Sequence, residues 1–155
     1  MINWISDKMG RKKEYMNTYT AALSKIGKFE SEVSIRDLTL TIDEPERLGG
    51  TNKGPNPVEV LLASLAGCLD FTGTIVAKEM GYELENLEIE VEGDMDPRGV
   101  MGKADVPIGF QEIRVKFNDI DGIPKEDISD FLKEVENRCP VDNTLEEGVR
   151  IKIER

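Results

Sequence analysis

Residues 56–81, NPVEVLLASLAGCLDFTGTIVAKEMG, decide how the rest of this chain folds. Asn56 and Pro57 are residue types typical of the N-cap and the first position of a helix. Gly81 is the type that most often ends a helix in the left-handed conformation. The pattern therefore predicts a helix from Pro57 to about Met80. Because its middle is apolar on nearly every side, we expect a central helix that other elements cover all round.

The segment before this helix has the pattern of a β-meander. Residues 14–43 alternate β-branched or aromatic residues with polar ones, and turns are expected at Gly27 and at Arg36-Asp37. A loop follows over residues 43–57, where prolines and paired glycines exclude regular structure. This part of the chain predicts a three-stranded antiparallel sheet that leads into the helix through a long loop.

The segment after the helix alternates strands and helices. Strict alternation of apolar and polar residues predicts two strands, at residues 84–95 and 110–120. An amphipathic run predicts a helix at 124–138, and a run that follows Cys139 with a proline predicts a short helix at 139–148. A final alternating run predicts a strand at 149–154. We therefore expect an α+β fold, with antiparallel sheets packed around a long central helix. We expect one domain over residues 14–155, divided into 14–54 and 55–155, after a possible N-terminal extension at 1–13.

Composition limits the partners and the location of the protein. The chain has 155 residues and a net charge of −11, with a pI near 4.6. Such a charge disfavours binding to nucleic acid or to an anionic membrane surface. We read no apolar stretch approaching the roughly 20 residues of a membrane span and no signal-peptide core. The sequence therefore predicts a cytoplasmic protein without nucleic-acid or membrane partners.

Two cysteines and no histidine narrow the possible chemistry. The absence of histidine excludes Ser-His-Asp and Cys-His catalysis and the usual zinc sites. Cys68 lies in the apolar helix and Cys139, 71 residues later, precedes a proline, so the two form no CxxC pair and are too few for a structural zinc site. Thiol redox chemistry without a metal is the leading candidate. The alternative is that both thiols are simply buried packing residues.

Four segments together resemble the OsmC/Ohr family, and in particular its OsmC-like branch. They are DEPERLGGTNKGPNPVEVLLASLAGC at 43–68, LEIEVEG at 87–93, GFQEIRVKF at 109–117 and RCPVDNTL at 138–145. The resemblance implies a thiol-dependent peroxidase that reduces organic hydroperoxides in oxidative stress defence, built as an intertwined homodimer with its active sites at the subunit interface. It assigns Cys68 as the peroxidatic thiol and Cys139 as the thiol that resolves the sulfenic acid into a disulfide, which an external dithiol then reduces.

The sequence departs from the Ohr pattern at two positions. The catalytic glutamate that follows the Asn-Pro pair in that pattern is replaced by Val58, and the acid comes one residue later at Glu59. Glu59 is thus either a capping residue or a residue that orients the activating cation. The arginine that holds the thiolate in the pattern has no assigned counterpart here, and Lys25, Lys28 and Arg36 are the candidates.

The peroxidase hypothesis requires a cation near Cys68. A free thiol with a pKa near 8.5 is only slightly ionised at neutral pH, and a position three turns into an apolar helix does not favour the thiolate. An Arg or Lys within about 4 to 6 Å is therefore needed. Two alternatives stay open: a redox sensor or a binding protein for a small apolar ligand without useful turnover, and a structural dimer whose thiols only pack.

Overall fold

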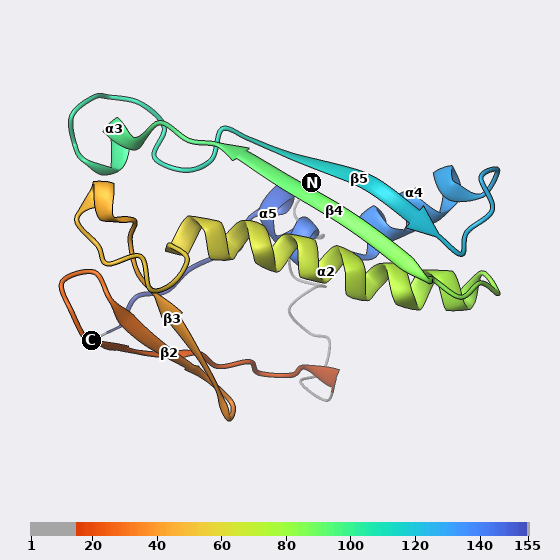
Figure 1. Ribbon diagram of the computed structural model, residues 1–155, viewed down its shortest axis with the longest axis horizontal. Helices are drawn as coiled ribbons and strands as arrows, with labels where there is room; N and C mark the ends of the chain where they lie inside the picture. Colours follow the sequence, from red (N-terminus) through yellow and green to blue (C-terminus); the bar gives the residue numbers. More distant parts are fainter. Residues whose placement is uncertain (1–14, 155) are drawn as a thin grey trace, which may run out of the picture. The chain divides into compact units, whose positions relative to one another are not determined.

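The computed structural model describes residues 15–154, in two compact units, Met1–Asn56 and Pro57–Arg155. The possible extension at residues 1–13 lies outside the described residues. The architecture is α+β, with two antiparallel sheets and one long helix, as the sequence predicts (Figure 1).

The N-terminal unit contains a three-stranded antiparallel meander. Its strands are β1 (Ala22–Lys25), β2 (Ser31–Ile35) and β3 (Leu38–Ile42), in the order β1-β2-β3. The register places Leu23 and Leu40 on either side of Val33, which is the buried member of the three. The predicted three strands are confirmed. The first strand is shorter than the alternation suggested, since it begins at Ala22.

The loop after β3 is organised by one buried carboxylate. One oxygen of Asp43 accepts hydrogen bonds from the Thr51 hydroxyl at 2.7 Å, the Thr51 N–H at 2.8 Å and the Lys53 N–H at 3.3 Å. These bonds, chiefly that from the Thr51 hydroxyl, lower the pKa of Asp43 to about 2 against the opposing effect of burial. A short 3-10 helix, η2 (Glu46–Leu48), lies inside this loop. The Gly50 backbone runs so close to Glu44 that an added Cβ would lie 1.9 Å from the carbonyl oxygen, which excludes any larger residue.

The central helix α2 (Pro57–Glu79) begins and ends where the caps predict. At its C-terminus Gly81 has a φ of +87°, and the N–H groups of Tyr82 and Gly81 bond to the carbonyls of Ala77 and Lys78 at 2.9 and 3.2 Å. This pair of bonds is the Schellman motif, which satisfies the last carbonyls of the helix. The local cap residues therefore suffice to set both ends.

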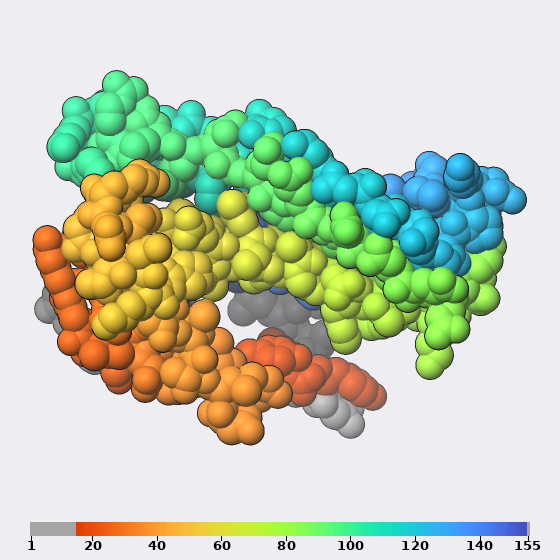
Figure 2. Space-filling view, viewed as in Figure 1, coloured from red at the N-terminus to blue at the C-terminus, as the bar shows by residue number. Residues whose placement is uncertain are grey.

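The expectation that α2 is covered all round is wrong for this chain. One face of α2 is buried, and the buried residues follow the three-to-four-residue spacing of a helix face: Leu65, Leu69, Thr72, Gly73, Val76 and Ala77. The opposite face is open, and Phe71 is 65% exposed. Figure 2 shows one side of α2 at the surface, as a yellow to yellow-green band beside the green of β4.

The expectation that no apolar stretch approaches the length of a membrane span is wrong, because α2 has that length and composition. Among residues 15–154 it is the single helix long and apolar enough to cross a membrane, a test that core helices of water-soluble proteins pass as well. In this structure α2 packs against β4, α4 and α5.

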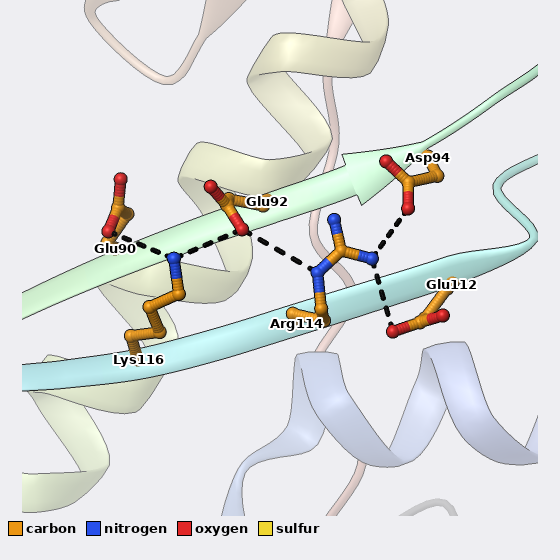
Figure 3. Close-up of polar contacts among 6 residues, drawn as sticks. All are labelled: Glu90, Glu92, Asp94, Glu112, Arg114 and Lys116. Atoms are coloured by element: carbon orange, nitrogen blue, oxygen red, sulfur yellow. Dashed lines mark hydrogen bonds and ion pairs between the residues drawn. The ribbon is translucent and has the colours of Figure 1, made fainter.

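Strands β4 (Asn86–Asp94) and β5 (Glu112–Asp121) form an antiparallel pair alongside α2 (Figure 1). The loop between them carries a short helix, α3 (Pro97–Val100). Alternate residues of this pair, including Ile89, Val91, Val115 and Phe117, pack against the core. The other face carries a charged network, in which Arg114 binds Glu92, Asp94 and Glu112 while Lys116 binds Glu90 and Glu92 (Figure 3).

Two further helices complete the C-terminal unit, α4 (Ile128–Arg138) and α5 (Pro140–Glu147). Phe131 and Val135 of α4 are fully buried against Leu65, Leu69 and Val76 of α2. Gly73 faces this packing, and an added Cβ would lie 3.4 Å from both Phe131 and Leu87, which is an ordinary van der Waals contact. The core of this unit therefore lies between α2, the inner face of the β4–β5 pair and the two short helices.

The predicted last strand is wrong. Residues 149–154 have no strand structure, and Val149, Ile151 and Ile153 are 70%, 82% and 92% exposed. Their alternation fits an extended strand with one apolar face, but within the described residues no sheet edge pairs with them.

Candidate functional site

Cys68 lies at the border between the buried and the open face of α2. It is partly exposed, and the neighbouring Leu65 and Leu69 are buried. The carbonyl of Cys68 accepts a hydrogen bond from the Thr72 hydroxyl at 2.8 Å. Beside it, Gly67 leaves open space, because an added Cβ there would meet no atom within 4 Å. Cys68 is thus held on a helix, and part of its surface meets solvent.

Cys139 is the junction residue between α4 and α5. It ends α4, serves as the N-cap of α5, and is completely buried. The backbone on both sides is fixed, because the Cys139 N–H donates to Glu136 at 3.3 Å and the Cys139 carbonyl accepts from Asn143 at 3.0 Å. Pro140 starts α5, which suits a residue with no N–H to leave unpaired.

The structure brings the two cysteines together although 71 residues separate them. Both thiols are free and belong to the same core, where α2 packs against α4 and α5. Burial raises the pKa of the Cys139 thiol, and hydrogen bonding and charge interaction with Cys68 raise it further. The N–H groups of Asp142 and Val141 oppose this shift without forming a full cap on the sulfur. Cys139 is therefore held as a protonated thiol next to Cys68.

Glu59 lies in the first turn of α2 and is exposed. Nine residues separate it from Cys68, which amounts to about 14 Å along the helix and half a turn around it. Glu59 instead borders a groove of about 280 Å³ lined by Leu62, Ala63, Ala66 and Val91. Within one chain, the structure does not bring this carboxylate to the thiols.

The three candidate cations all belong to the N-terminal unit. Lys25 is the last residue of β1, Lys28 lies 4.9 Å from the centre of the Phe29 ring, and Arg36 forms the β2–β3 turn with a φ of +59°. In the C-terminal unit, Arg138 directly precedes Cys139 but binds the Glu79 carboxylate, with one N–O distance of 3.1 Å. No lysine or arginine in the described part of the chain contributes to the pKa shift of Cys139.

A cavity between α2, β5, α4 and α5 was not predicted from the sequence. It measures about 390 Å³, and its walls combine apolar residues of α2 and β5 with acids and amides of α4 and α5: Leu69, Val115, Phe117, Glu136, Asn137, Asp142, Asn143 and Glu146. Leu69 follows one cysteine, and Asp142 lies three residues after the other. The cavity forms where α5 packs beside α4, α2 and β5, and this packing could not be read from the sequence. The acids and amides that flank Cys139 were the one sequence feature that could have pointed to a polar cavity wall.

Comparison with known proteins settles the family. Residues 50–154 match the family model described as OsmC-like protein. The chain belongs to the OsmC-like protein family. A curated relative of this OsmC-like chain, the hydroperoxide reductase of Mycoplasma genitalium, is 28% identical over 102 residues, which cover 66% of this chain and 70% of the relative.

Solved structures of OsmC-like proteins share the fold. An OsmC-like protein from Mycoplasma pneumoniae superposes with a TM-score of 0.72 at 24% identity and covers 86% of this chain and 89% of its own. An organic hydroperoxide resistance protein from Legionella pneumophila gives a TM-score of 0.64 at 23% identity, with coverage of 88% and 95%. At these identities the structural likeness establishes the α+β architecture of the chain.

Proposed function

We propose that this OsmC-like protein is a two-cysteine peroxidase that reduces organic hydroperoxides in oxidative stress defence. The observation that carries the proposal is the pairing of a partly exposed Cys68 with a buried, protonated Cys139 in one core. The name of the curated relative, hydroperoxide reductase, supports the same substrate class. The exposure of the two side chains supports Cys68 as the thiol that meets the peroxide.

The cycle has three steps. The Cys68 thiolate attacks the distal oxygen of ROOH, the O–O bond breaks, and Cys68 becomes a sulfenic acid, while RO⁻ leaves and takes up a proton from solvent to give ROH. The Cys139 sulfur then attacks the Cys68 sulfur, which forms the disulfide and releases the hydroxyl with the Cys139 proton as water. A dithiol finally returns both cysteines to thiols and leaves as its own disulfide. No cofactor beyond this external dithiol is required.

The cycle needs a cation beside Cys68. Lys25, Lys28 and Arg36, or another lysine or arginine, are the candidates, either from the same chain or from a second copy. In this scheme Glu59 orients the cation from the start of α2. Replacing each of the three cations by Met and measuring the rate of Cys68 alkylation identifies the one that favours the thiolate.

We further propose a homodimer in the cytoplasm, where thiols are kept reduced and dithiols are available. Two features support the homodimer: the open face of α2 with the exposed Phe71, and the unpaired apolar residues of segment 149–154. In both places the exposed apolar area is removed from water only when another protein surface covers it, and this burial is favourable. Light scattering after gel filtration gives the mass, and a monomeric mass at micromolar concentration contradicts this part of the proposal.

Free-thiol content after one equivalent of tert-butyl hydroperoxide tests the chemistry. We expect rapid loss of both thiols in wild type, slower loss with hydrogen peroxide, and no loss in Cys68→Ser. Cys139→Ser is the matched control and loses one thiol, to a sulfenic acid that dimedone traps. Survival of both thiols in the folded protein rules out the peroxidase.

Turnover separates an enzyme from the second candidate, a redox sensor or a binding protein for a small apolar ligand. This second candidate is supported by Val58, which stands where the Ohr pattern has its catalytic glutamate. With excess dithiol and hydroperoxide, an enzyme consumes many equivalents of peroxide, whereas a sensor oxidises once and stops.

A further inference from the structure

The two sulfurs differ in how an external reductant can reach them. The Cys139 side chain is 0% exposed and is packed among core residues of α2, α4 and α5. Cys68 is partly exposed, and the neighbouring Gly67 has no side chain to cover it. Thiol–disulfide exchange requires the attacking sulfur to approach the disulfide in line, so access decides which sulfur is attacked.

The two sulfurs also differ in how they can accept the negative charge of a leaving group. Cys68 lies in the middle of α2, where the backbone N–H groups are engaged in helical hydrogen bonds. Cys139 precedes the first turn of α5, where the N–H groups of Asp142 and Val141 partly offset the burial that raises the pKa of its thiol. Attack on Cys68 sends the electron pair to Cys139, where these N–H groups reduce the cost of the charge, and access to the sulfur decides the direction of attack.

We propose that the external dithiol attacks Cys68, so that the mixed disulfide forms on Cys68 and Cys139 is always the leaving group. This inference rests on the Cys68–Cys139 disulfide of the proposed function. The reductant thiolate bonds to the Cys68 sulfur, the Cys68–Cys139 bond breaks, and the Cys139 thiolate takes up a proton. The second thiol of the reductant then attacks its own sulfur in the mixed disulfide and releases the Cys68 thiolate.

The test maps the mixed disulfide in protein that was oxidised without peroxide. Diamide accepts the two electrons and two protons of the thiols and is reduced to the hydrazine, which leaves the disulfide whether or not the protein is a peroxidase. The oxidised protein is mixed with 2-mercaptoethanol for milliseconds, quenched in acid to stop exchange, alkylated and analysed by peptide mass. We expect the adduct on Cys68 in about ten-fold or greater excess over Cys139.

The outcomes separate this inference from the proposed function. An adduct mainly on Cys139 at the earliest times overturns the inference and leaves the peroxidase intact. Failure of diamide to join the cysteines in the folded protein overturns both the disulfide and the inference. A disulfide that forms with diamide but not with hydroperoxide removes the peroxidase, and the adduct position still decides the inference.

Two matched variants test the route of approach. Ser64 lies one helical turn before Cys68 on the exposed side of α2, and Asn143 lies one turn after Cys139 on the cavity wall. Ser64→Phe is expected to slow reduction by 2-mercaptoethanol about ten-fold, whereas Asn143→Phe leaves the rate within about two-fold of wild type. The reverse result places the reductant in the cavity on the Cys139 side and contradicts attack at Cys68. Circular dichroism of both variants checks that each is folded.

Discussion

The N-terminal and C-terminal units are organised by different kinds of interior. Among the described residues of the N-terminal unit, Val33 is the one buried apolar side chain, and the other well-buried group is the Asp43 carboxylate. The C-terminal unit buries a continuous apolar cluster around Phe131 and Val135. One unit is therefore held by strand pairing and a polar loop, and the other by close apolar packing.

This difference teaches where the stability of each unit comes from. A three-stranded sheet with almost no apolar interior is marginal in water unless another surface covers it. The N-terminal sheet exposes Leu23 and Leu38 at 60% and 57%. The C-terminal unit encloses its own core and also contains both cysteines. The two cysteines thus lie in the unit whose interior does not depend on another surface.

The largest effect is expected from Phe131→Ala in the C-terminal core. Phe131 is fully buried between α4 and α2, so its removal should lower the free energy of unfolding by about 3–5 kcal/mol. Urea unfolding measures this loss. Phe71→Ala is the control of the same chemistry on the open face of α2, and a monomer should lose less than about 0.5 kcal/mol. Equal losses would contradict the division of α2 into two faces.

A smaller effect is expected at the junction of α4 and α5. Cys139→Ser places a hydroxyl in a fully buried site and should cost about 1–3 kcal/mol, whereas Cys139→Ala avoids the polar group. The same change at the partly exposed Cys68 should cost less. Thermal unfolding of the three variants under reducing conditions makes the comparison. A cost at Cys68 that exceeds that at Cys139 would show that the exposures are reversed in solution.

In the N-terminal unit we expect Asp43→Asn to weaken the loop after β3 and thereby to lower the stability of that unit. The pKa of Asp43 is lowered to about 2, so the folded state gains from its charge above the ordinary carboxylate pKa near 4 and loses that gain as the pH falls toward 2. Asp43→Asn should melt several degrees lower at pH 7 and lose its difference from wild type toward pH 2. Hydrogen exchange should quicken over residues 44–53. Asp37→Asn, in the exposed β2–β3 turn, is the control and should change neither quantity.

The smallest effect is expected on the charged face of β4–β5. Lys116 lowers the pKa of Glu92 chiefly through a hydrogen bond, so the pair contributes above the unfolded pKa of Glu92, and the contribution is lost as the pH falls through the lowered value. Because both side chains are solvated, Lys116→Met should melt within about 2 °C of wild type. The difference should shrink further in 0.5 M salt. A larger, salt-independent loss would mean that this face is covered in solution.

The parts of the fold that follow local rules could be predicted from the sequence. The ends of α2 follow from Pro57 and Gly81, because the cap residues satisfy helix ends without help from distant segments. The two antiparallel sheets follow from alternation. The strand predicted at residues 149–154 is absent from the described structure, because alternation shows that these residues have an apolar face but not whether a sheet edge is available to pair with them.

The candidate site depends on longer-range packing, and less of it follows from residue patterns. Nothing in the spacing of Cys68 and Cys139 predicts that they meet, and only the resemblance to the OsmC/Ohr family paired them. The open face of α2 is a second example, because apolar composition predicts that a helix face is covered but not whether the same chain or another one covers it. The roles of Cys68, Cys139 and Glu59 stay predictions for the experiments above.

The open segment at residues 149–154 has a consequence for self-association. An unpaired run with high β-propensity is a template for edge-to-edge assembly into cross-β aggregates. Here each apolar residue is followed by a charged one, Arg150, Lys152 or Glu154. Stacking identical copies in register would bring like charges about 5 Å apart, and the resulting repulsion opposes fibril growth. The alternation therefore gives this segment one apolar face that favours association and one charged face that opposes in-register stacking.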